Sequence, residues 1–231
     1  MEPTIELLQT AIFTKNFLIK DDYEKSKILI GLKEKIGDIF DGQLVSIPIP
    51  NDAPPEFPRF TMNSQNKIYS CDVSLVRTNI LFDVAVDMEK DQNNLMEKQK
   101  KVSLKLFNLF KEENIIINRI GFVAKAYYKE KNGVDFLKSK FINEKRLNNP
   151  KELLIRYNQK SDLPSLNVEM NNLVTFSNKI NDKEIINIQT DINTVAEIMP
   201  DINFCIEDKG LAVLDFSIEK TKEFINNFPI I

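Results

Sequence analysis

The chain of 231 residues contains no histidine and no tryptophan, and it has only six glycines and two cysteines. Without histidine it cannot form a Ser-His-Asp or Cys-His catalytic arrangement, and it cannot bind zinc through imidazole. Six glycines also leave little material for a phosphate-binding loop, which requires several within a short window. A carboxylate-dependent or lysine-dependent enzyme remains open. No catalytic residue, metal ligand set or cofactor is predicted.

The two cysteines and the N-terminus indicate the compartment. Cys71 and Cys205 are far apart and belong to no motif, so two buried free thiols are favoured over a disulfide or a reactive cysteine. The acidic N-terminus carries no basic segment of the kind that opens a secretory signal. No stretch approaches the roughly 20 apolar residues of a membrane helix. The sequence therefore predicts a cytoplasmic protein without a membrane partner.

The hydrophobic pattern predicts an α+β fold. Apolar residues at steps of three and four predict helices over Tyr23–Phe40 and Asn93–Glu113. Strands are predicted before, between and after these helices. Helices interrupted by hairpins are typical of a mostly antiparallel sheet, with the two long helices on one face. Residues 1–130 form this unit.

Residues 131–231 are predicted as a C-terminal α+β portion, which either extends the first sheet or forms a second one. It contains a short helix over Asp135–Ile142, three strands and a final helix over Ile218–Asn227 that Ser217 caps. No tandem repeat of fixed period is visible.

A proline-rich segment, residues 48–58, holds five of the ten prolines. Each residue before a proline is pushed out of the helical region, so the segment must be extended and stiff. A rigid crossover is favoured over a proline-rich docking peptide. The strand predicted at Leu44–Ile49 contains Pro48, which indicates the edge of the sheet.

Around this segment the chain resembles an uncharacterised, sporadically distributed bacterial family. The resemblance rests on Pro58-Arg59, Ser64 and Arg77, and on the order of helices and strands around them. The family carries a glutamine before that arginine and an Asn-Trp pair after it, where this chain has Asp72, Leu81 and Phe82. The resemblance implies a bacterial source and no particular activity.

Charge is distributed unevenly along a chain whose formal net charge is −3. Residues 1–118 carry a net charge of −3, residues 119–160 of +7, and residues 161–231 of −7. The basic block predicts a cationic face for an acidic protein partner or for the acidic third of a second copy. The residues expected to form this face are Lys125, Lys129, Lys138, Lys140, Lys145 and Arg146.

Two further readings of the charged segments stay open. The basic block also carries Phe122, Tyr127, Tyr128, Phe136, Phe141 and Tyr157, and aromatic rings among cations suit single-stranded nucleic acid. The favoured alternative is that these rings belong to the core and that the lysines form a solvated face paired with the acidic C-terminal third. A pI near 5.3 also disfavours a nucleic-acid binder. Carboxylates in the C-terminal third suggest a Mg²⁺-dependent enzyme, although their spacing fits no calcium loop. They are Asp191, Glu197, Asp201, Glu207 and Asp208.

A last candidate site involves two arginines among the predicted strands. Arg59 and Arg77 lie near Asp72 and Asp83 in the sequence, and a half-buried arginine among strands usually pairs with a carboxylate. Alternatively, the two arginines form a pocket for a carboxylate or phosphate. Taken together, the sequence favours a non-enzymatic binding or regulatory protein that acts through a protein–protein surface or by self-association.

Overall fold

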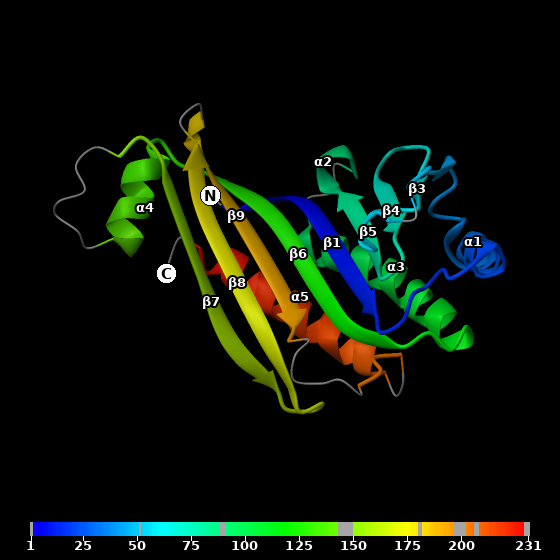
Figure 1. The fold of residues 1–231 in the computed structure, drawn as a ribbon. Coiled ribbons are helices and arrows are strands. Elements are labelled where there is room, and N and C mark those ends of the chain that lie inside the picture. Colours follow the sequence, from blue (N-terminus) through cyan, green and yellow to red (C-terminus); the bar gives the residue numbers. More distant parts are fainter. Residues whose placement is uncertain are drawn as a thin grey trace.

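The computed structural model describes residues 2–50, 52–87, 91–142, 150–179, 182–195, 202–205 and 208–228. These residues form five helices and one nine-stranded antiparallel sheet, which confirms the predicted α+β class (Figure 1). The strand order is β2-β3-β4-β5-β1-β6-β9-β8-β7. The strands are β1 (Thr4–Thr14), β2 (Leu44–Ser46), β3 (Phe60–Asn63), β4 (Tyr69–Val73), β5 (Arg77–Asp83), β6 (Ile117–Lys129), β7 (Leu153–Leu163), β8 (Val168–Lys179) and β9 (Asp182–Thr194). The helices are α1 (Asp22–Ile36), α2 (Val84–Asp87), α3 (Gln92–Glu112), α4 (Gly133–Phe141) and α5 (Lys209–Asn226).

The order of elements along the chain repeats, although the sequence shows no repeat of fixed period. Apart from the short elements β2 and α2, which occur only in the first half, each half has a long strand, a helix, three consecutive strands and a final long helix: β1, α1, β3-β4-β5 and α3, then β6, α4, β7-β8-β9 and α5. The opening strands β1 and β6 pair with each other at the centre of the sheet. The C-terminal portion therefore extends the first sheet and does not form a second one.

Helices α3 and α5 lie behind the strands in Figure 1, against one face of the sheet. Alternate residues of β1 show which side chains point toward them: Leu8 and Ile12 are fully buried, while Gln9 and Phe13 are partly exposed on the other face. A buried polar contact fixes α3 on this strand, because Gln99 Nε2 donates to Thr10 Oγ1 at 3.0 Å. No helix formed by the described residues is both long and apolar enough to span a membrane.

The first predicted helix begins as expected and ends early. Asp21 caps α1 by accepting the backbone N–H of Glu24 at 2.8 Å. The predicted end at Phe40 is wrong: the helix ends at Ile36, and the N–H of Phe40 donates to the Ile36 carbonyl in a turn. Phe40 is still buried, edge-on to the ring of Tyr69. The apolar spacing that includes Phe40 therefore identifies a core residue but does not show that the helix extends to it.

The final helix is longer than predicted. It begins at Lys209 and not after Ser217. Ser217 lies inside the helix, fully buried, and its hydroxyl donates to the Val213 carbonyl at 2.7 Å. A serine hydroxyl can cap the start of a helix, and it can also donate to the carbonyl one turn back inside a helix. The sequence alone does not distinguish these two positions.

The proline-rich segment connects β2 to β3 and is anchored at two points. The N–H of Leu75 donates to the Pro55 carbonyl at 3.0 Å, and Arg59 Nη1 donates to the Pro50 carbonyl at 3.3 Å. β2 is three residues long and lies at one edge of the sheet, which confirms the edge position predicted from Pro48. The segment thus covers the end of a short edge strand.

Candidate functional site

One face of the sheet, the face turned toward the viewer in Figure 1, is not covered by α3 or α5. We call it the uncovered face. Near one end of the strands, Phe13 on β1 lies directly opposite Arg77 on β5 and Arg119 on β6. The guanidinium carbon of Arg77 is 5.8 Å from the Phe13 ring centroid, and that of Arg119 is 4.8 Å away. A phenylalanine between two arginines is the candidate binding site, and we call it the arginine pair.

The arginine pair keeps its charge available. Among the described residues, neither Arg77 nor Arg119 forms an ion pair with a carboxylate. The Nε atoms of both are buried without a hydrogen-bond partner. A guanidinium stays charged at any ordinary pH and matches a carboxylate or phosphate with two parallel hydrogen bonds. Two such groups on one surface form a site for an acidic group from outside.

Amide side chains link Arg119 to the far edge of the sheet. Arg119 Nη2 donates to Asn193 Oδ1 at 3.2 Å, and Asn171 Nδ2 reaches the same oxygen at 3.4 Å. Asn158 Nδ2 then donates to Asn171 Oδ1 at 3.2 Å. Asn193 Nδ2 also donates to Asp191 Oδ1 at 2.9 Å. This chain of side-chain hydrogen bonds orients Arg119 and occupies one carboxylate oxygen of Asp191 on β9.

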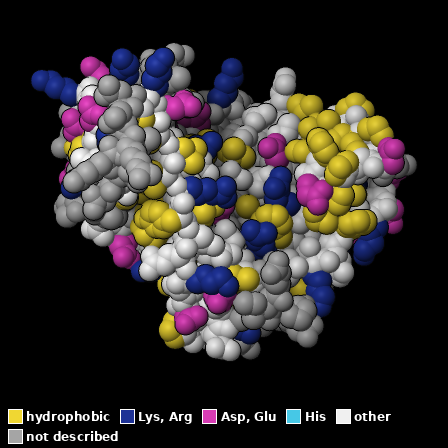
Figure 2. Space-filling model, turned by 60° about the vertical axis from the view of Figure 1, so that its left-hand side comes forward, with side chains coloured by type: hydrophobic (Ala, Val, Ile, Leu, Met, Phe, Trp, Pro, Cys, Tyr) yellow, Lys and Arg dark blue, Asp and Glu magenta, His cyan; other side chains and the backbone are white. Residues whose placement is uncertain are grey.

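The residues beside the arginine pair are small. Ala11 and Gly121 lie opposite each other on β1 and β6, two residues along from Phe13 and Arg119. A Cβ atom at Gly121 would lie 3.4 Å from that of Asn193 and 3.9 Å from that of Ala11. The side chains of Arg77 and Arg119 therefore rise beside a surface that small residues keep shallow. Figure 2 views this face obliquely, with β7 and α4 brought forward, and Lys and Arg side chains gather near its middle.

A hollow of ≈ 600 Å³ lies on the same face toward the other end of β1. Leu7, Leu81 and Ile68 form its apolar lining, with Asp83 and Ser70 beside them. The uncovered face thus offers both charged and apolar contact over much of its length.

The structure separates the two arginines that the sequence grouped. Arg77 belongs to the arginine pair, but Arg59 does not. Arg59 donates to the carbonyls of Pro50 and Ala53, at 3.3 and 3.5 Å, and holds the proline-rich segment in place. The expected carboxylate partners are absent: within the described ranges, neither arginine forms an ion pair with Asp72 or Asp83.

The residues of the basic block lie on both sides of the sheet. Lys125 and Lys129 are exposed on β6, alternate with the buried Ala126 and Tyr128, and so point to the uncovered face. Lys138 and Lys140 lie on α4, whose Phe136 packs against Tyr128 and Phe228 on the helix-covered face. Lys145 and Arg146 lie outside the described residues. The structure therefore brings Lys125 and Lys129, but not Lys138 or Lys140, to the face of the arginine pair.

The aromatic residues of the basic block are mostly core. Phe122 and Tyr128 are buried, and Phe141 stacks on the fully buried Phe176 at 4.9 Å between centroids. Tyr157 also contacts Phe176, and Phe136 contacts Tyr128. Of the six rings in the block, Tyr127 alone lies on the uncovered face. Five rings are therefore not placed to stack on a base.

The acidic residues of the C-terminal third do not form a site in the described part of the chain. Asp191 lies on the uncovered face of β9, and Asp208 precedes α5 with a φ of 58°. Glu197, Asp201 and Glu207 lie outside the described residues. Among the residues that the structure does describe, no group of three or more Cys, Asp or Glu could hold a metal ion.

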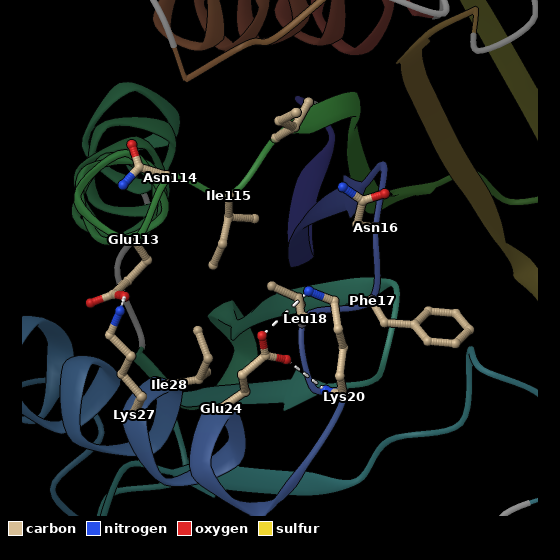
Figure 3. Close-up of a pocket in the computed structure, with 11 residues that line it drawn as sticks. Asn16, Phe17, Leu18, Lys20, Glu24, Lys27, Ile28, Glu113, Asn114 and Ile115 are labelled. Atoms are coloured by element: carbon tan, nitrogen blue, oxygen red, sulfur yellow. Dashed lines mark hydrogen bonds and ion pairs between the residues drawn. The ribbon is translucent and has the colours of Figure 1, made fainter.

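A second cavity, of ≈ 150 Å³, lies between α1, the residues after β1 and the end of α3 (Figure 3). Its charges are paired within the protein. Lys27 pairs with Glu113, and the hydrogen bond that its ammonium donates to that carboxylate raises the pKa of Lys27. Glu24 accepts from the backbone and side-chain nitrogens of Lys20 at 2.8 and 3.3 Å. These pairs connect α1 to neighbouring segments. Because the charged side chains that line the cavity bind each other, they are not available to bind a charged ligand.

Three residues of the site were not singled out from the sequence: Phe13, Arg119 and Asn193. They come together because β1 pairs with β6, and β6 with β9. No protein-family model matches the chain, and no curated protein matches it.

Proposed function

We propose that this chain is a non-enzymatic binding protein whose uncovered face holds an acidic segment of a protein partner. The observation that carries the proposal is the arginine pair, Arg77 and Arg119 on either side of Phe13, without a carboxylate partner among the described residues. The helices packed on the other face serve as the scaffold that keeps the strands in register. In this arrangement the site is built on rigid strands, which hold binding groups more accurately than loops.

The ring between the arginines contributes to the site. Phe13 draws both guanidinium groups toward its face, because the electron-rich ring attracts a cation. An arginine held this way loses less conformational entropy when it binds a carboxylate. Lys125 and Lys129, exposed on the same face, add long-range attraction for an acidic segment.

An acidic protein segment fits this face better than a nucleic acid does. The same face carries Asp72, Asp83 and Asp191, which would repel a continuous phosphate backbone. A short acidic segment needs only to reach the arginine pair. The net charge of −3 also gives the whole chain no general attraction for nucleic acid.

Fluorescence anisotropy with a labelled oligoglutamate peptide at low salt tests this proposal. We expect binding that weakens with added salt, and a loss of at least about tenfold when Arg77→Gln and Arg119→Gln are combined, since a hydrogen bond to a charged group contributes about 1.5–3 kcal/mol.

The matched control removes two positive charges from exposed positions on the helices, Lys33→Gln with Lys101→Gln. This variant should bind as the natural chain does. Equal losses in both variants, or binding of an oligothymidylate in preference to the peptide, would refute the proposal.

A further inference from the structure

The two edges of the sheet differ in how they are protected. β2, at one edge, has three residues and is followed by Pro48 and Pro50. β7, at the other edge, has eleven residues without proline or glycine, and it pairs with β8 from Leu153 to Leu163 without a register shift. Within the described ranges no strand pairs with the outer side of β7. A long regular edge strand is a template on which another strand can add.

We infer that a second copy of this chain pairs with it through β7, antiparallel and centred on Gln159. A twofold axis at that residue places each strand opposite itself, as in a symmetric dimer. In this register Arg156 lies opposite Asp162 of the second copy, and Ile155 lies opposite its Leu163. Symmetry makes each of these contacts twice.

The side chains that would meet are suited to each other. Arg156 and Asp162 are exposed, lie on the uncovered face, and form no ion pair among the described residues. Lys160, between them, is already bound to Glu169 at 2.5 Å. Ile155 and Leu163 alternate with these residues and so point to the opposite, helix-covered face. Cross-strand pairs of opposite charge and of apolar residues each stabilise a sheet.

The neighbouring registers fit less well. A register centred on Asn158 places Arg156 opposite Lys160 of the second copy, and like charges directly opposite destabilise a sheet. A register centred on Tyr157 places Leu154 opposite Lys160 and Ile155 opposite Gln159. Of these three registers, the pattern of the strand favours the one centred on Gln159.

The geometry of the rest of the molecule agrees with this pairing. Figure 1 shows α4 beside the first part of β7, and the rest of the strand, which provides most of the proposed pairing, runs away from that helix. A twofold axis perpendicular to the sheet keeps both uncovered faces on the same side. The dimer would present two arginine pairs on one continuous sheet, whether or not their ligand is an acidic segment.

Sedimentation of variants over a range of concentrations tests the inference. The natural chain should change with concentration from 26.7 kDa to twice that mass. Arg156→Asp alone, or Asp162→Arg alone, should stay monomeric at concentrations where the natural chain dimerises, because each places like charges opposite each other. Mixing the two single variants should restore a dimer, and so should combining both substitutions in one chain. A natural chain that stays monomeric throughout, or single variants that dimerise normally, would overturn the inference.

A cross-link tests the register. Gln159→Cys places a thiol opposite its own copy at the twofold axis, so an oxidised sample should contain a disulfide-linked dimer. Tyr23→Cys, which exposes a thiol on α1, serves as the control and should not cross-link more than a random collision allows. Equal cross-linking of the two variants contradicts the proposed register.

Discussion

Arg119 on β6 lies with its guanidinium carbon 4.8 Å from the centroid of Phe13 on β1, on the face of the sheet opposite α3 and α5. The two residues are more than a hundred positions apart, and only the central pairing of the two halves brings them together. With Arg77 on the other side of the ring, this contact creates a cationic surface on a rigid support. That surface is the basis of the binding role that we propose for the uncovered face.

The position of Lys125 predicts an effect on association rate. Lys125→Glu reverses a charge on the uncovered face and should slow association of an acidic peptide, with the largest effect at low salt. The melting temperature should change little, since Lys125 is exposed. Lys140→Glu, on α4 at the other side of the sheet, is the matched control. Stopped-flow association rates measure both, and equal slowing would show that the face is not the site.

The core under α3 predicts a large loss of stability on truncation. Leu106 is fully buried within the helix-covered core, so Leu106→Ala should lower the free energy of unfolding by about 2–5 kcal/mol. Lys101→Ala, at an exposed position of the same helix, should change it by less than about 0.5 kcal/mol. Urea unfolding measures both. A loss below about 1 kcal/mol at Leu106 would contradict the packing of α3 on the sheet.

The two cysteines should be unreactive in the folded protein. Burial raises the pKa of the Cys71 thiol, which is fully buried, and it raises that of Cys205 to about 11. The thiolate is the reactive form, so both should react slowly with a disulfide reagent at pH 8, and Cys71 more slowly than Cys205. In the fully unfolded chain, both thiols should react at the rate of an ordinary free thiol. Native-state reaction of Cys71 at the rate of a free thiol would be inconsistent with its position.

Tyr69 predicts a loss of stability in alkali. Its ring stacks on Phe82, and burial, with a smaller effect from the Asp87 carboxylate, raises its pKa from 10.0 to about 12. Below pH 10 the phenol is neutral in both states. As the pH rises from 10 to 12, the unfolded chain ionises first, and unfolding becomes more favourable.

The variant Tyr69→Phe keeps the ring and removes this ionisation. Its free energy of unfolding, relative to that of the natural chain, should therefore rise as the pH increases from 10 to 12. Urea titrations at several pH values measure the difference. A difference that is constant with pH would show that Tyr69 ionises equally well in the folded protein.

The sequence predicted most of the elements but little of the site. Helix α3 could be placed because a buried stripe repeats over many turns, and β1 because alternating residues define a strand. The end of α1 was misplaced because Phe40 continues the apolar spacing after the helix has stopped. Local patterns report which residues are buried, and they do not always distinguish a helix from the turn that follows it.

The site depends on strand pairing, which local patterns do not encode. Arg77 could be named from the sequence, but its neighbours Phe13 and Arg119 are set by contacts of β1 with β5 and β6. The basic block failed to predict one surface for a similar reason. A run of sequence that forms a strand and then a helix places its lysines on opposite sides of the sheet.

The central claim, that the arginine pair is where an acidic segment binds, can be tested with a single fluorescent reporter. The chain has no tryptophan, so Phe13→Trp introduces one indole between Arg77 and Arg119. Titration with an oligoglutamate peptide should shift or quench its emission with the same dissociation constant that anisotropy gives. Tyr23→Trp, a reporter on exposed α1, should not respond. Binding by anisotropy without any change in the emission of the Phe13→Trp variant would contradict the claim.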